Sequence, residues 1–212
     1  MNRWECIGFR NLKNEASLLQ VLSDAVHKSH SISRNTFVCR PFEACELVIQ
    51  LDKEGDPECV EISLMGFPQA FIFQQCEKRE HDYVIRGFSC LDGSPLFPLE
   101  FICSNSVSDD EVGNLKFVEL SAYSSELKPS NKCESEMSVE CCEEFGVMDF
   151  HGVLLNQTNY ENKFTHEMVV LSKVFVPGMI VPICTQKKCE IASGSMVEGR
   201  IKLFGNVFEN NK

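Results

Sequence analysis

Short segments in which apolar and polar residues alternate recur along the chain, and they limit its fold more than any other feature. In CVEISLM, Val60, Ile62 and Leu64 fall on one face of an extended chain, and Glu61 and Ser63 fall on the other. A period of two is typical of a half-buried strand. Comparable segments are ACELVIQL, QAFIFQQC, YVIRGFSC, LFPLEFICS and LKFVELSAY, with turn-forming stretches such as DKEGDPE and DGSP between them. The pattern predicts a mainly β fold, an antiparallel sandwich or barrel.

One helix is expected near the start of the chain. In NEASLLQVLSDAVHKSH, apolar residues recur at helical spacing from Leu18 to Val26. Asn14 is a suitable N-cap for this helix. The following SHSISRN is mostly polar and reads as a loop.

The composition changes in the middle of the chain. Residues 126–144 contain few large apolar side chains and an excess of glutamate, which is typical of a linker or loop. Strand-like segments resume after it. We therefore expect a β-rich domain with a leading helix at 1–125, an acidic linker at 126–144, and a small barrel-like region at 145–212. This last region could also be part of the same fold as the first.

The chain contains twelve cysteines but no secretory signal sequence and no apolar run long enough to span a membrane. We expect a nuclear or cytoplasmic protein that binds no membrane and whose thiols are reduced and mostly buried. There is no CxxC pair, the usual spacing of structural zinc ligands. A metalloprotein or thiol enzyme remains an alternative, built from these cysteines: Cys133, Cys141, Cys142, Cys184 and Cys189.

No catalytic or cofactor signature is present. The chain has no phosphate-binding loop and no nucleophile motif of the G-x-S-x-G type. Asp149 and His151 share a strand face but have no nucleophile beside them in the sequence, and His27 and His30 read as a solvated helix end. We therefore expect no enzyme, no cofactor and no metal.

The segment SMVEGRIKLFG is the best candidate for ligand binding. As a strand it would direct Val197, Ile201 and Leu203 inward and the residues between them outward. Two cations followed by an aromatic ring suit single-stranded nucleic acid, because the cations bind phosphates and the ring stacks on a base. The candidate residues are Arg200, Lys202 and Phe204, with Lys187 and Lys188 in the preceding loop. The net charge of −11 argues against general polyanion binding.

The C-terminal strand series, GVMDFHGVLL, EMVVLSKVFV, GMIVPI and MVEGRIKLF, resembles a small OB-type barrel over roughly residues 146–205. OB folds occur as subunits of single-strand-binding and chromosome-end-capping complexes, such as the replication protein A small subunit and Stn1. The resemblance implies a DNA-associated assembly at single strands or telomeres.

The sequence as a whole predicts a non-enzymatic interaction subunit of a nuclear or cytosolic multiprotein complex. Its partners would be other protein subunits, with single-stranded nucleic acid as a further candidate at the C-terminal region. Apolar residues near the two ends of the sequence are candidate docking residues: Trp4, Ile7, Phe9, Val207 and Phe208.

Overall fold

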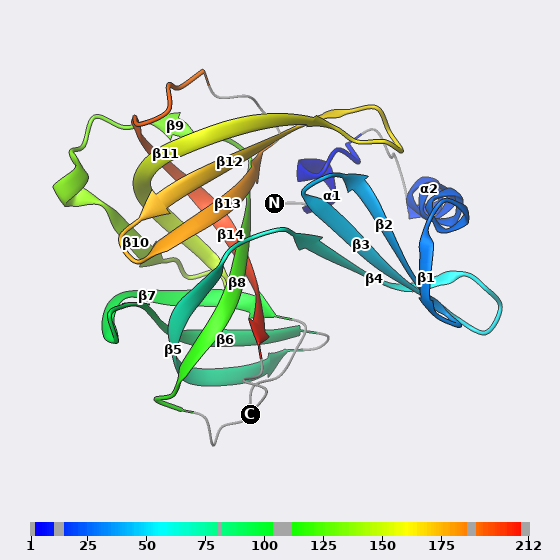
Figure 1. Ribbon diagram of the computed structural model, residues 1–212, viewed down its shortest axis with the longest axis horizontal. Helices are drawn as coiled ribbons and strands as arrows, with labels where there is room; N and C mark the ends of the chain where they lie inside the picture. Colours follow the sequence, from blue (N-terminus) through cyan, green and yellow to red (C-terminus); the bar gives the residue numbers. More distant parts are fainter. Residues whose placement is uncertain (1–2, 11–14, 80–81, 104–111, 186–189, 209–212) are drawn as a thin grey trace.

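The computed structural model describes residues 3–10, 15–79, 82–103, 112–185 and 190–208. Within these residues the chain is mainly β, as expected, and its strands form two sheets (Figure 1). The smaller sheet has the order β1-β2-β3-β4, with these bounds: β1 His30–Ser33, β2 Thr36–Phe42, β3 Cys45–Leu51 and β4 Pro57–Leu64.

Two helices accompany this sheet, α1 (Arg3–Cys6) and α2 (Glu15–His27), so the prediction of one helix missed α1. Asn14, the expected N-cap of α2, lies outside the described residues. The expected loop SHSISRN contains β1, which pairs antiparallel with β2. All four residues of β1 are exposed, and a strand without a buried face shows no apolar alternation in its sequence.

The larger sheet contains the remaining described strands. Their bounds are β5 Pro68–Arg79, β6 Asp82–Leu91, β7 Ser94–Cys103, β8 Leu115–Ser124, β9 Lys128–Pro129, β10 Ser138–Cys141, β11 Val147–Glu161, β12 Met168–Val176, β13 Met179–Thr185 and β14 Met196–Phe208. Most pairings are antiparallel, but β13 with β8 and β14 with β7 are parallel.

The larger sheet is ring-like. Eight strands follow one another in the order β11-β12-β13-β8-β5-β6-β7-β14, and β14 pairs again with β11. β14 also pairs with β8 over six residue pairs, from Leu203 opposite Ala122 to Phe208 opposite Phe117. This pairing runs across the ring, so β8 and β14 are common to its upper and lower parts in Figure 1.

Two apolar clusters hold the fold together. One lies inside the ring and contains Val197, Ile201 and Leu203, which face inward on β14 as predicted. The other joins the smaller sheet and both helices to the outer side of β8, β12 and β13, through residues such as Tyr123 and Cys184. Because both faces of these three strands are covered, their burial lacks a simple alternation.

Strand pairs join the first and the third of the three expected parts of the chain. β8 belongs to residues 1–125, yet it pairs with β13 and β14 from residues 145–212. The segment expected as a linker, 126–144, contains β9, a 3-10 helix at Glu134–Glu136, and β10, which pairs with β11. The division into separate domains is untested by these contacts and stays a prediction.

Six of the eleven described cysteines are buried, and all eleven are free thiols. The buried ones are Cys6, Cys39, Cys45, Cys90, Cys103 and Cys184. Burial raises the pKa of Cys39 to about 11, because a thiolate is poorly solvated in an apolar core. In the described part of the chain, neither helix has the length and apolar character needed to cross a bilayer.

Candidate functional site

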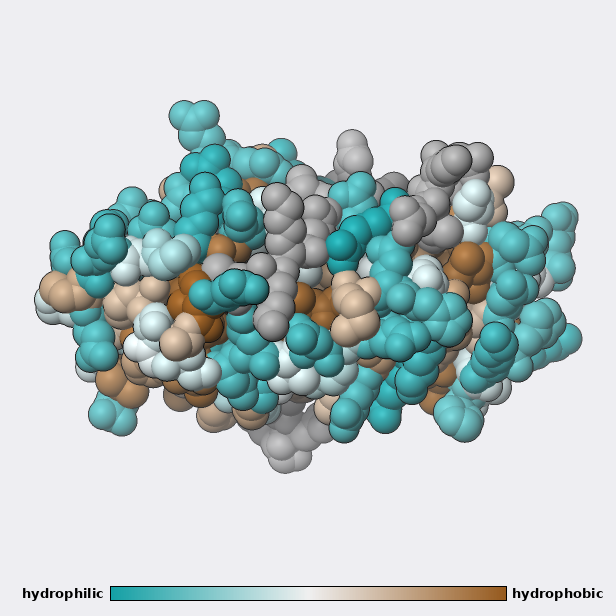
Figure 2. Space-filling view, turned by 90° about the horizontal axis from the view of Figure 1, so that it is seen from above, coloured by the Kyte–Doolittle hydropathy of each residue, from teal (hydrophilic) through white to brown (hydrophobic). Residues whose placement is uncertain are grey.

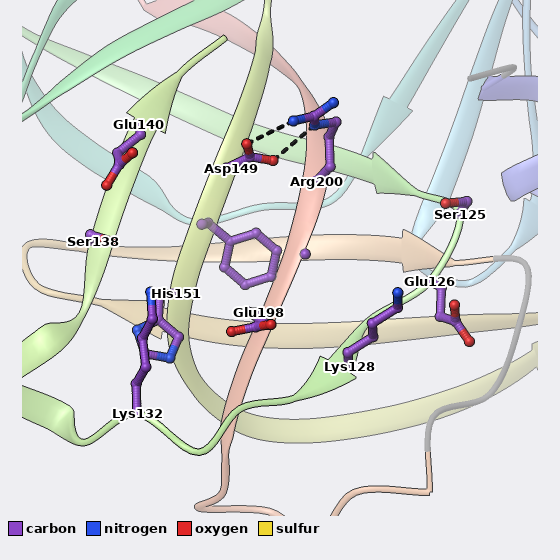
Figure 3. A pocket seen from close by; sticks show the side chains of 12 residues that line it. Ser125, Glu126, Lys128, Lys132, Ser138, Glu140, Asp149, His151, Glu198 and Arg200 are labelled. Carbon is purple, nitrogen blue, oxygen red and sulfur yellow. Dashed lines mark hydrogen bonds and ion pairs between the residues drawn. The ribbon is translucent and has the colours of Figure 1, made fainter.

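Polar side chains of β9, β10, β11 and β14 form two rows on the outer face of the ring. Cross-strand pairing places Glu140, Asp149 and Arg200 in one row. The next row contains Ser138, His151, Glu198 and Lys128. These residues line a hollow of about 510 Å³, which we call the polar hollow (Figure 3).

Arg200 is bound by its neighbour in the first row. Its Nε and Nη2 atoms donate to Oδ1 and Oδ2 of Asp149, both at 2.8 Å. These hydrogen bonds hold the pKa of Asp149 below its ordinary value and raise that of Arg200. The prediction treated Arg200 as a phosphate ligand, but in the structure its guanidinium already binds a carboxylate.

His151, in the second row, is buried, and both of its ring nitrogens have a partner. Its Nδ1 lies 2.9 Å from the carbonyl oxygen of Glu136, and its Nε2 lies 2.7 Å from the hydroxyl of Ser130. The same hydroxyl lies 2.9 Å from Oε2 of Glu198. Because a carbonyl oxygen only accepts, Nδ1 is the donor in its contact.

These contacts attach residues 130–136 to β11 and β14. Sequence analysis interpreted His151 as an ordinary strand residue and placed it correctly beside Asp149. It missed the network, since Ser130 gives no signal in the sequence. The hydroxyl of Ser130 has two side-chain partners and also accepts the backbone N–H of Lys132, which suits a structural role better than that of a nucleophile.

Lys202 and Phe204 follow Arg200 on the outward face of β14, as predicted, but the three side chains lie in different hollows. Lys202 lines a hollow of about 410 Å³, where its Nζ is 3.2 Å from Oε1 of Glu144. The ring of Phe204 meets Tyr123 edge-on at 5.3 Å and lies 5.6 Å from the guanidinium carbon of Arg3.

The local charge along β14 is therefore balanced. Both predicted cations that the structure describes, Arg200 and Lys202, have carboxylate partners. Lys187 and Lys188 lie outside the described residues. The prediction of nucleic-acid binding by these five residues is not tested by the geometry.

The candidate cysteines do not gather into one site in the described part of the chain. Cys184 is buried and its thiol donates to the carbonyl of Cys6 at 3.1 Å, whereas Cys133 and Cys141 are exposed. Cys189 lies outside the described residues. Burial is also the main reason why the pKa of Cys184 and that of Cys141 are raised, which disfavours the reactive thiolate.

Only one group of three potential metal ligands lies close together among the described residues, Asp52, Glu54 and Asp56. Oδ1 of Asp52 accepts the backbone N–H groups of Glu54, Gly55 and Asp56 at 2.8–2.9 Å. This carboxylate therefore stabilises the turn between β3 and β4.

An apolar surface on β5, β6, β8 and β14 is the feature that sequence analysis missed. Phe117 on β8 pairs with Phe208 on β14, and Leu115 on β8 pairs with Ile72 on β5, which also pairs with Phe88 on β6. We call these five residues the outer apolar face. Phe117, Phe208 and Leu115 are 46%, 42% and 45% exposed.

The sequence contained a weak signal for this surface. In LKFVELSAY both Leu115 and Phe117 occupy the solvent side of a strand, where polar residues are usual. The face of the molecule seen in Figure 2 is mainly hydrophilic, with small hydrophobic areas between polar residues. Comparison with protein-family models, curated proteins and solved structures found no match to this chain.

Proposed function

We propose that the protein is a non-enzymatic interaction subunit of a nuclear or cytosolic multiprotein complex and that the outer apolar face is its docking surface. The observation that carries the proposal is the exposed pair Phe117 and Phe208, on adjacent strands, with Leu115 next along β8. Aromatic side chains are enriched in the cores of protein interfaces, and a continuous apolar patch is unusual on a surface that stays in water.

Two of the residues that the sequence suggested for docking are inaccessible in the structure. Ile7 and Phe9 are buried in the protein's own core, at 0% and 2% exposure, so they cannot meet a partner without unfolding. Trp4 packs against that core and its ring lies 5.3 Å from Phe9. Phe208 is the expected residue whose exposure best suits docking, with Val207 half-buried beside it.

The strand order supports an OB-like barrel as the scaffold. β5, β6, β7, β14 and β8 pair in that order, and β8 pairs again with β5, which suits a closed five-stranded Greek-key barrel. The four strands in the region 146–205 would form a second such barrel only by including β8. On this basis we propose that the assembly acts at single-stranded DNA or chromosome ends.

Protein contact is favoured over direct DNA contact because the described cations of the predicted DNA face are paired with carboxylates. A cysteine-based metalloprotein or thiol enzyme is the alternative. It has less support, because the candidate cysteines are dispersed between the core and the surface.

The test is affinity purification of the tagged protein from its native cells, with and without nuclease, for the wild type and for Phe117→Glu/Phe208→Glu. We expect stoichiometric protein partners that survive nuclease and whose recovery falls about tenfold or more in the variant, because buried aromatic anchors dominate interface energies. The matched control is Leu155→Glu/Met168→Glu, which adds the same charges at exposed apolar residues elsewhere and should leave recovery unchanged.

Circular dichroism first establishes that both variants are folded. Partners lost on nuclease treatment and unaffected by the Phe117 and Phe208 changes would refute docking at the outer apolar face. That result would instead favour DNA contact through Arg200, Lys202 and Phe204.

A further inference from the structure

The free edge of β4 lies along a hollow between the two sheets. β4 pairs with β3 from Leu64 to Pro57, and within the described residues it has no partner on its other side. The hollow has a volume of about 430 Å³ and is lined by β4 from Cys59 to Leu64. Phe204 of β14 is among the residues that face β4 across it. An edge strand exposes unpaired N–H and C=O groups that can accept another strand.

The mouth of this hollow is negatively charged. Glu61 and Asp82 are exposed and line it, with Arg3 as the opposing cation. The pKa of the Cys59 thiol reflects these charges. Burial raises this pKa most, and the carboxylates of Glu61, Glu58 and Asp82 raise it further. The guanidinium of Arg3 lowers it. A positively charged chain is therefore favoured in the hollow.

Charge also argues against a second copy of this chain as the occupant. Antiparallel pairing of β4 with itself would bring Glu58 and Glu61 of one copy towards those of the other. Like charges opposite one another destabilise a strand pair. These glutamates protect the edge from self-association and leave it open to a basic segment.

We propose that the free edge of β4 binds an extended, basic segment of a partner protein, which adds a fifth strand to the smaller sheet. The proposal rests on the proposed role as an interaction subunit and names the kind of segment that the protein accepts. Main-chain hydrogen bonds to β4 supply affinity, and alternate side chains meet Glu61 and Asp82 on one side and the ring of Phe204 on the other. The six residues from Cys59 to Leu64 accommodate about 20 Å of extended chain.

The first experiment selects binders from a random twelve-residue peptide display library against the full chain. Selected peptides are synthesised, and their dissociation constants are measured for the wild type and for Glu61→Lys/Asp82→Lys. We expect peptides in which Lys or Arg alternates with apolar residues, and a loss of affinity of about tenfold or more in this variant. Glu134→Lys/Glu140→Lys changes the charge equally at exposed positions away from β4 and should alter affinity less than about threefold.

The second experiment locates the peptide with the protein's own thiols. Cys59 lines the hollow and Cys133 is exposed in the segment attached to β11, so their rates of alkylation by iodoacetamide can be compared in one sample. A bound peptide should slow alkylation of Cys59 and leave that of Cys133 unchanged. Peptides that bind without slowing Cys59, or that bind Glu61→Lys/Asp82→Lys equally well, would overturn the proposal, as would a library without binders.

The Phe117→Glu/Phe208→Glu variant separates this proposal from the proposed function. If that variant loses its cellular partners while the wild type binds no peptide at β4, docking at the outer apolar face stands and strand addition fails. If wild-type protein recovers no partner from cells but binds basic peptides at β4, the outer apolar face has lost its role and strand addition stands.

Discussion

Arg200 and Asp149 lie opposite each other on β14 and β11, and their two hydrogen bonds set the protonation of the carboxyl group. Because the folded protein holds the pKa of Asp149 below its ordinary value, this pair stabilises the fold fully above that ordinary value. The contribution is lost as the pH falls through the lowered pKa. Both side chains are largely exposed, so solvent screens the effect.

Replacing Arg200 with Gln removes the main cause of this shift. We expect the pKa of Asp149 to rise towards the ordinary value for aspartate, which NMR titration of its side-chain carboxyl carbon measures directly. Lys202→Gln removes an equal charge two residues further along β14 and should leave Asp149 unchanged. An unaltered titration in Arg200→Gln would contradict the role given to the pair.

Sequence analysis placed these residues correctly on their strands but could not pair them. Arg200 and Asp149 are 51 residues apart, and their contact depends on the register between two strands. The pattern in SMVEGRIKLFG shows which side chains share a face. It contains no information on the acidic neighbour that occupies the guanidinium. The same reason explains why the Ser130–His151 contact was missed.

At the scale of elements, β6 shows what a strand pattern leaves out. Gly87 lies in the middle of YVIRGFSC, and a Cβ atom there would come within 2.1 Å of the carbonyl oxygen of Ile72 and 2.4 Å of the Phe71 ring. The adjacent strand therefore occupies the space of a side chain. The sequence predicts the strand but gives no reason for its glycine.

Gly87→Ala should therefore destabilise the protein although alanine is only one methyl group larger. We expect the free energy of unfolding to fall by about 1–3 kcal/mol, because the backbone of β5 must move to admit the Cβ atom. Urea denaturation measures the change. Lys78→Ala, at an exposed position of β5, should stay within about 0.5 kcal/mol of the wild type. If the urea midpoint of Gly87→Ala equals that of the wild type, β5 and β6 can move apart at little cost.

Elements with several buried apolar residues were predicted well, and the short or exposed elements were not. The helix α2 and the strands β3–β8 and β11–β14 all carry apolar residues, at a regular spacing where one face is buried and more closely spaced in β12 and β13, where both faces are covered. β1 has no buried residue, and its one apolar side chain, Ile32, is exposed. β9 and β10 lie in a stretch whose composition is that of a linker. They are strands because a neighbouring strand supplies hydrogen-bond partners.

At the scale of the whole molecule, closure depends on β14. It pairs with β7, β8, β9 and β11, and its inward residues belong to the apolar cluster inside the ring. A chain that ends at residue 195 should therefore lack a cooperative unfolding transition, since strands β7, β8 and β11 lose a partner together. A chain that ends at residue 208 is the control and should unfold like the full chain.

Thermal unfolding followed by circular dichroism distinguishes these two chains. Addition of a synthetic peptide covering 196–208 should restore the transition to the shorter one. A cooperative transition in the shorter chain without the peptide would show that the upper and lower parts of the ring are stable without their shared strand.

The mainly β class follows from local patterns, but ring closure does not. Phe204 on β14 meets Ile102 on β7, and Phe208 meets Phe117 on β8, across about half the chain. No local pattern encodes such pairings. The outer apolar face and the hollow beside β4 arise from this closure, so sequence analysis found single residues of each surface but neither surface as a whole.

The position of β14 in the chain also sets an order in time. The ribosome makes β14 after every other described strand. The edges of β7, β8 and β11 that pair with β14 therefore stay unpaired until β14 has been synthesised. Contacts across so much of the chain form slowly, and unpaired edges attract other chains during that interval. We therefore expect the nascent protein to require chaperones until its shared strand has left the ribosome.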